Sequence, residues 1–259
     1  MKVPFVFVHG AGCTSAVWKH QLEASSLGAH PGGLVAFTLP GREGPGSGGH
    51  STLKPAGQVP AVTSSPGIDA RAEAVAEALR ERGVDRAVVV GHSMGGAVAL
   101  SLALGPHASL VAGLALVSTG ARLRTAPLIL ELARDDPAGL LDLMPQYVFS
   151  RRWRRTHPDE VAEVLDVMRG VPPETTLDDF ASCDAFDVMD RLGDVDAPVL
   201  VACGERDQLT PPKYARYLAD ELPRARSPVL VPGAGHFLMV EAPGPLNEAL
   251  ARFGKETHQ

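Results

Sequence analysis

The stretch Ala87–Leu104 reads AVVVGHSMGGAVALSLAL, and it decides the fold. An apolar run at 87–90 precedes the motif Gly91-His92-Ser93-Met94-Gly95, and an apolar stretch of helical period follows the motif. This is the pattern G-x-S-x-G between a strand and a helix, where a tight turn exposes the serine hydroxyl. The two glycines leave room for the turn, and the N-terminus of the helix directs N–H groups at a developing oxyanion. The context therefore predicts that Ser93 is a nucleophile rather than part of a structural glycine turn.

Five other short runs are also nearly all apolar, as expected for strands that are covered on both faces. The expected strands are 3–8, 34–39, 87–91, 113–117, 199–203 and 228–231, and the expected helices between them are 16–27, 68–82, 94–104, 212–221 and 245–253. Alternating strands and helices predict an α/β fold with a mostly parallel sheet flanked by helices.

The segment 119–196 has no convincing strand and interrupts this alternation. Its helical patterns at 126–134, 137–149, 158–169 and 176–192 predict a helical insertion that divides the core into residues 1–118 and 197–259. Its apolar side chains either pack on the core or line a site beneath the insertion. The Gly-, Pro- and Ser-rich stretch 40–67 is interpreted as a functional lid or a disordered loop.

The composition excludes several classes of protein. The chain has 259 residues, of which 45% are hydrophobic and 21% are charged, so a globular domain is expected. A net charge of −6 argues against nucleic acid or an anionic membrane as a partner. There is no apolar run long enough for a membrane span, and 1–8 is too short for a secretory signal. Three cysteines without a C-x-x-C pair favour a reducing compartment, so a cytoplasmic location is expected.

The expected base and acid lie in loops that follow strands. His236 follows the last strand, and Asp207 follows the strand at 199–203. The carboxyl ends of parallel strands meet at one edge of a sheet, so both side chains should lie near Ser93. His9 and His92 are the alternative bases by nearness in sequence, and Glu205 is the closest competing acid.

Small residues after the first strand predict an oxyanion hole. In His9-Gly10-Ala11-Gly12 the backbone is able to approach a bound carbonyl group, and His9 is interpreted as shaping this loop. The expected donors are the backbone N–H groups of Ala11 and Met94, each worth about 2.7–4 kcal/mol in the transition state. No cluster of His, Cys and carboxylates has zinc-like spacing, so neither a metal nor an organic cofactor is expected.

The segments 6–12, 88–96, 199–211 and 233–243 resemble the α/β-hydrolase superfamily. The end of the insertion at 183–195, with the following 204–211, resembles the cap-bearing bacterial carboxylesterases and lactonases of this superfamily. The resemblance implies an α/β-hydrolase fold with about six strands, a catalytic triad of Ser93, Asp207 and His236, and a helical cap at 119–196. The β-hairpin with which the family usually begins is missing, as in its small esterase and hydroxynitrile-lyase branch. Many relatives read Asp-Leu-Pro-Gly-His-Gly where this chain has Thr38-Leu39-Pro40-Gly41-Arg42-Glu43-Gly44.

The expected function is hydrolysis of carboxylic esters or lactones of small to medium, mostly apolar substrates through an acyl-enzyme. The candidate pocket residues are Trp18, Leu123, Met144, Phe149, Trp153, Phe186, Leu209 and Phe237. The arginines at 151–152 and 154–155 either face water or hold a substrate carboxylate. Ser93 argues against dehalogenases and epoxide hydrolases, whose nucleophile is Asp, and Gly10 stands where hydroxynitrile lyases carry Thr.

Several alternatives stay open. The same triad serves C–C bond hydrolysis, thioester hydrolysis, acyl transfer and lyase activity. An alternative from another class is a non-catalytic ligand receptor on the same fold, in which an intact triad is permitted. The oligomeric state is not predicted.

Overall fold

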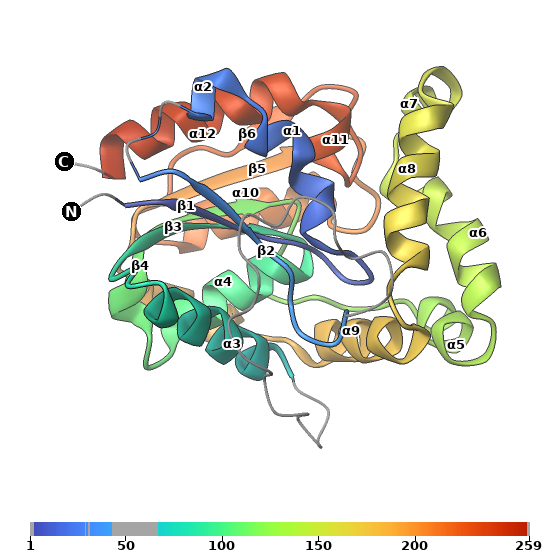
Figure 1. Cartoon of the computed structure of the whole chain (residues 1–259), viewed down its shortest axis with the longest axis horizontal. Helices are drawn as coiled ribbons and strands as arrows, with labels where there is room; N and C mark the ends of the chain where they lie inside the picture. Colours follow the sequence, from blue (N-terminus) through green and yellow to red (C-terminus); the bar gives the residue numbers. More distant parts are fainter. Residues whose placement is uncertain (1–2, 29, 31, 43–66, 258–259) are drawn as a thin grey trace.

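All six predicted strands are present, and they form one parallel sheet in the order β2-β1-β3-β4-β5-β6 (Figure 1). The computed structural model describes residues 3–28, 30, 32–42 and 67–257. The strands are β1 (Phe5–Val8), β2 (Leu34–Phe37), β3 (Ala87–His92), β4 (Val111–Val117), β5 (Val199–Gly204) and β6 (Val229–Val231). The parallel α/β sheet that the sequence predicts is therefore confirmed.

Successive residues of each strand contribute to two different hydrophobic clusters, because successive side chains point to opposite faces of a sheet. Val6 and Val8 join a cluster with α3 (Ile68–Glu81), α4 (Met94–Leu104) and α10 (Pro212–Glu221). Phe5 and Phe7 join a cluster on the other face. The elements on that face are η1 (Ser15–Trp18), α1 (Lys19–Leu22), α2 (Ser25–Gly28), α11 (Leu238–Glu241) and α12 (Pro243–Thr257).

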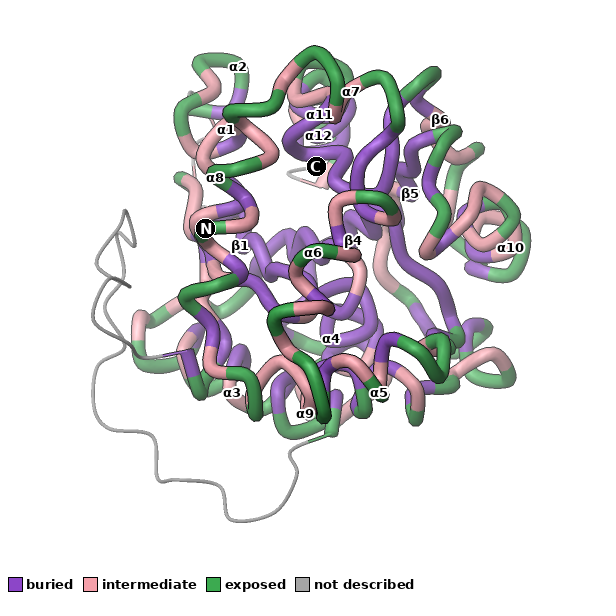
Figure 2. Tube along the Cα trace, turned by 90° about the vertical axis from the view of Figure 1, so that its right-hand side faces the viewer, coloured by how far each residue is buried: buried purple, intermediate pink, exposed green. Residues whose placement is uncertain are grey.

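Every residue of β3 and β4 is buried, as are nine of the eleven residues of α4, whereas the outer helices are partly exposed (Figure 2). Each fully buried Val, Leu or Phe side chain contributes roughly 1.5–3 kcal/mol. The strand before Ser93 and the helix after it therefore lie in the most stable part of the molecule. A short helix η2 (Ala108–Leu110) leads from α4 into β4.

The helical insertion (residues 119–196) lies between β4 and β5 and covers the carboxyl ends of the strands (Figure 1). Its helices are α5 (Pro127–Asp135), α6 (Pro137–Val148), α7 (Arg151–Thr156), α8 (Pro158–Arg169) and α9 (Pro173–Ala185), followed by η3 (Met189–Asp194). Four of these helices begin with proline, whose fixed φ suits the first helical position. The fifth, α7, was not predicted, and it begins where the Ser150 side chain accepts a hydrogen bond from the Trp153 N–H.

Two predicted helices differ from the structure. The helix expected at 16–27 is divided into η1, α1 and α2, because Trp18 and Gln21 both turn into the core and Gln21 bonds to Met239 O and Asn247 Oδ1. The helix expected at 176–192 ends at Ala185, where the chain becomes extended and Asp187 bridges to Arg122. Tertiary contacts outweigh local helix propensity at both places.

None of the described helices is both long and apolar enough to cross a bilayer. Most of the stretch 40–67, which the sequence predicts to be a lid or a disordered loop, lies outside the described residues.

Candidate active site

Ser93 occupies a strained turn between β3 and α4. Its φ of 53° is in a region that non-glycine residues rarely adopt, so the surrounding structure must hold the turn. The Ser93 N–H donates to Val117 O at 3.0 Å, and Thr119 Oγ1 donates to Ser93 O at 2.7 Å. A Cβ on Gly91 would lie 2.2 Å from the carbonyl oxygen of Gly95, so only glycine fits across the turn. The strand–turn–helix geometry that the motif predicts is present.

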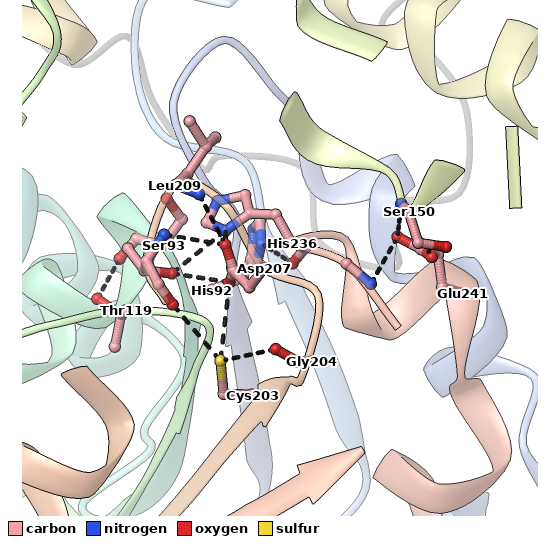
Figure 3. Close-up of polar contacts among 12 residues, drawn as sticks. His92, Ser93, Thr119, Ser150, Cys203, Gly204, Asp207, Leu209, His236 and Glu241 are labelled. Atoms are coloured by element: carbon pink, nitrogen blue, oxygen red, sulfur yellow. Dashed lines mark hydrogen bonds and ion pairs between the residues drawn. The ribbon is translucent and has the colours of Figure 1, made fainter. Parts of the chain in front are cut away.

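Asp207 and His236 form a buried pair beside Ser93 (Figure 3). His236 Nδ1 lies 2.9 Å from Asp207 Oδ2 and 3.1 Å from Oδ1. Asp207 follows β5 and His236 follows β6, so the loops after two neighbouring strands bring the side chains together. The contact that the sequence predicts between these residues is therefore present.

Asp207 accepts several further hydrogen bonds. The N–H groups of Leu209 and Thr210 donate to Oδ1 at 3.0 and 2.9 Å, and Thr210 Oγ1 donates to Oδ2 at 2.9 Å. Burial alone would raise the pKa of Asp207, but His236 and the Thr210 bonds outweigh it and hold the pKa below its ordinary value. An ionised carboxylate only accepts hydrogen bonds, so Nδ1 of His236 is the donor in this pair.

No hydrogen bond joins Ser93 to the His236 ring among the described residues. Such bonds are often long in a site without substrate and shorten only when substrate binds. Ser93 is half-buried, so its side chain is more accessible than the two buried partners.

The two alternative bases have other roles in the structure. His9 Nδ1 donates to Gly10 O at 2.8 Å, and its Nε2 accepts from the Leu39 N–H at 3.0 Å. Burial, helped by the charge of Arg42, lowers the pKa of His9 well below its ordinary value, so the ring is neutral. Both nitrogens are thus occupied, and His9 shapes the loop after β1 as expected from the sequence.

His92 is neutral as well. Burial, with a contribution from His236, lowers its pKa to about 3. Its Nε2–H donates to the backbone oxygen of His236 at 3.0 Å, and the two rings are 4.8 Å apart. Glu205, the competing acid, is exposed, and Asp207 takes the place beside His236.

The expected oxyanion donors come from two different parts of the chain. Met94 is the first residue of α4, and Ala11 lies in the loop after β1. Within the part of the chain that the structure describes, the N–H groups of Ala11 and Met94 make no hydrogen bond. Both donors are therefore available to a ligand.

Residues 5–249 match the sequence profile of the alpha/beta hydrolase family. The chain belongs to this family. It is similar to "Putative carbamate hydrolase RutD" of Variovorax paradoxus (strain S110), with 31% identity over 94% of this chain and 88% of the relative.

Two solved structures resemble this alpha/beta hydrolase along most of its length. One is a thermophilic esterase, with 31% identity, a TM-score of 0.75, and coverage of 98% of this chain and 90% of the other. The second is an enzyme that degrades N-acyl homoserine lactones, with 26% identity, a TM-score of 0.77, and coverage of 98% and 93%.

A cavity of about 60 Å³ adjoins the loop after β1 in this alpha/beta hydrolase. It lies between that loop and the helical insertion, and its walls are mostly apolar. The lining residues are Gly12, Ala133, Pro137, Leu140, Leu141, Met168, Arg169, Val171, Pro173 and Thr176. These differ from the pocket residues expected from the sequence.

The expected pocket residues are distributed over both hydrophobic clusters. Leu123 and Phe186 are buried in the cluster with α3 and α4. The buried residues in the other cluster are Trp18, Met144, Phe149 and Phe237. Trp153 and Leu209 are half-buried, and the Trp153 ring stacks on His157 at 3.6 Å. Their role in substrate binding stays a prediction.

Sequence reasoning missed two polar residues around His236. Thr210 holds the acid, and its place three residues after Asp207 is a common spacing for such a side-chain bond. Glu241 is buried and accepts from Gly235 N at 3.0 Å and from Ser150 N at 3.1 Å, which links the loop of the base to the helical insertion (Figure 3). No pattern in the sequence marks Glu241. Among the described residues no group of three or more His, Cys, Asp or Glu side chains is arranged to hold a metal ion.

Proposed function

We propose that this alpha/beta hydrolase is a serine esterase that cleaves carboxylic esters or lactones through an acyl-enzyme. The observation that carries the proposal is the Asp207–His236 pair, with Nδ1 2.9 Å from the carboxylate, beside a Ser93 at the turn after β3. A serine needs a neighbouring base to become a nucleophile, and the base needs an acid that fixes its tautomer.

In the proposed mechanism Ser93 Oγ attacks the carbonyl carbon of the ester while its proton passes to His236 Nε2. The N–H groups of Ala11 and Met94 stabilise the oxyanion of the tetrahedral intermediate. The C–O bond to the leaving alcohol then breaks, and the alkoxide takes the proton from His236. Water attacks the acyl-enzyme with His236 again as base, which releases the acid and restores Ser93. Asp207 stays ionised throughout and stabilises the imidazolium.

The cavity beside Gly12 supports the proposed substrate class. Its lining residues do not include Ser93, Asp207 or His236, but they belong to the loop that carries Ala11 and to the helical insertion. They are mostly apolar, which favours a neutral acyl or alcohol arm of small to medium size. In this proposal the helical insertion acts as a cap that roofs the site. Gly10 argues against lyase chemistry of the hydroxynitrile type, because a Cβ at residue 10 would lie 2.9 Å from His92 Nδ1 and 3.2 Å from Ser93 Cβ.

Carbamate hydrolysis is a second candidate, favoured by the 31% identity to the RutD relative. A carbamate also carries a carbonyl group that Ser93 can attack, but its acyl-enzyme retains a nitrogen and is slower to hydrolyse. The two candidates therefore differ in the deacylation step.

The test is steady-state turnover of p-nitrophenyl esters of graded acyl length, several lactones and p-nitrophenyl N-methylcarbamate. Multiple turnovers of esters or lactones, with the carbamate giving only a single burst, support the esterase. Multiple turnover of the carbamate alone favours the second candidate. If p-nitrophenyl N-methylcarbamate labels Ser93 but none of the substrates is turned over, the result contradicts both candidates and favours a ligand receptor.

A further inference from the structure

Asp179 extends from the helical insertion to the loop that carries Ala11. It belongs to α9 and has no exposed surface. Its Oδ2 accepts the backbone N–H of Gly12 at 2.9 Å and also contacts Arg42 Nη2, while Oδ1 accepts from Arg71 Nη2 at 2.8 Å. A buried carboxylate with three donors is held in one position.

Arg42 extends this contact to the backbone around the loop. Its Nε donates to Cys13 O at 2.9 Å, and its Nη1 donates to Pro40 O at 2.6 Å. The planar guanidinium reaches three acceptors in fixed directions, which a lysine ammonium does not.

Ala11 therefore lies between two peptide groups that are each held by a side chain. The carbonyl oxygen of the Gly10–Ala11 peptide accepts from His9, and the N–H of the Ala11–Gly12 peptide donates to Asp179. A peptide group is planar and trans, so fixing the oxygen of Gly10 fixes the opposite direction of the Ala11 N–H. Gly12 has a φ of +62° and restrains the chain little by itself, so the Asp179 contact supplies the restraint on that side.

We propose that Asp179 is a positioning residue for the oxyanion hole, which it serves by holding the Gly12 N–H so that the Ala11 N–H faces the substrate carbonyl. This rests on the proposed function of Ser93. Arg42 holds the Asp179 carboxylate in place. The helical insertion thus contributes to transition-state stabilisation through one side chain, in addition to its contacts with the apolar parts of a substrate.

The decisive comparison is between Asp179→Asn and Asp178→Asn. Asp178 is the adjacent residue of α9 and pairs with Arg71 at 2.7 Å, but it makes no hydrogen bond to the loop after β1. We expect Asp179→Asn to lower kcat about 10- to 100-fold with little change in KM. A misplaced Ala11 N–H weakens a hydrogen bond that stabilises the transition state much more than the bound substrate. Asp178→Asn should stay within about twofold of the wild type.

Binding of an alkylboronic acid gives a readout that needs no turnover. The Ser93 oxygen forms a bond to boron, its proton passes to His236, and one boron oxygen takes the place of the oxyanion. The inhibition constant of the boronic acid should therefore rise in Asp179→Asn by the same factor by which kcat/KM falls. For variants without measurable turnover, the affinity for the boronic acid is measured directly by titration calorimetry.

The outcomes separate the two proposals. Wild-type enzyme without ester turnover contradicts the proposed function, whereas the boronate titration still reports on Asp179. A folded Asp179→Asn with wild-type kcat and wild-type boronate affinity overturns the positioning role. If Asp179→Asn does not melt cooperatively, Arg42→Lys replaces it, because the lysine keeps the charge but cannot reach the three acceptors. Unchanged kcat and boronate affinity in a folded Arg42→Lys likewise overturn the proposal.

Discussion

The Nε2–H of His92 donates to the backbone carbonyl oxygen of His236 over 3.0 Å. The residue before Ser93 thus holds the main chain of the residue proposed to act as base. Since the bond uses only the backbone of His236, it survives truncation of the His236 side chain. A His236→Ala variant therefore tests the loss of the imidazole without releasing the loop.

Ser93→Ala, His236→Ala and the double variant should each lose kcat by a similar factor, on the order of 10⁶, because the pair acts as a unit. The measurement is kcat on a p-nitrophenyl ester, with circular dichroism to check folding. If His236→Ala retained most of the activity, another base would be required. His9 is a poor replacement, because both of its ring nitrogens are already hydrogen-bonded.

Asp207→Asn should lower kcat by about 10⁴, less than the loss of Ser93, because the amide leaves His236 in the wrong tautomer. Glu205→Gln is the matched control, since it removes the nearest other carboxylate of the same loop, which is exposed. It should leave kcat within about twofold of wild type. A larger loss in Glu205→Gln than in Asp207→Asn would reverse the assignment of the acid.

Glu241→Gln should change how stability depends on pH. Burial raises the pKa of Glu241 above 4.5, so the folded protein binds this proton more tightly than the unfolded chain does. The stability that the protonated form contributes is fully present below pH 4.5 and is lost as the pH rises through the folded-state pKa. Glutamine keeps an acceptor for Gly235 and Ser150 but carries no charge.

The measurement is the free energy of unfolding in urea at several pH values between acid and neutral. The free energy of unfolding of Glu241→Gln should increase relative to that of wild type as the pH rises. Glu205→Gln serves again as the control. Its free energy of unfolding should differ from that of wild type by the same amount at every pH. Parallel curves for Glu241→Gln and wild type would show that the buried carboxylate does not titrate in this range.

Leu141 and Phe186 distinguish the cavity in the structure from the pocket predicted by the sequence. Leu141 is half-buried in the wall of the cavity, whereas Phe186 is buried in the cluster with α4. Leu141→Ala should raise the kcat/KM for long relative to short acyl esters by about 10-fold, and Leu141→Phe should lower it, since each methylene is worth about 1–3 kcal/mol. A shift caused by Phe186→Ala, with none at Leu141, would favour the pocket predicted from the sequence.

The sheet and the contact between Asp207 and His236 were predictable because both depend on local patterns. The six strands are short and almost wholly apolar, and the carboxyl ends of parallel strands meet at one edge. The division of the helix at 16–27 was not predictable, because it depends on which partners Trp18 and Gln21 find across the molecule.

The contacts of Asp179 could not be predicted from the sequence either. Asp178 and Asp179 are adjacent, and the sequence does not distinguish between them. Only the packing of α9 against the loop after β1 buries the second and leaves the first partly exposed. The cavity residues were missed for a related reason, because hydrophobicity predicts that a side chain is buried but not which space it borders.

The helical insertion divides the site along the chain. Ala11 and Ser93 precede it, whereas Asp207 and His236 follow it. During synthesis Ser93 and the loop that carries Ala11 leave the ribosome well before Asp207 and His236 exist. Under the proposed function, the first half of the chain is therefore inert towards esters in the cell until β5 and β6 join the sheet. A cut within the insertion would yield two silent fragments whose activity returns only when they reassemble, which makes this segment a natural place to split the enzyme into a reporter of proximity.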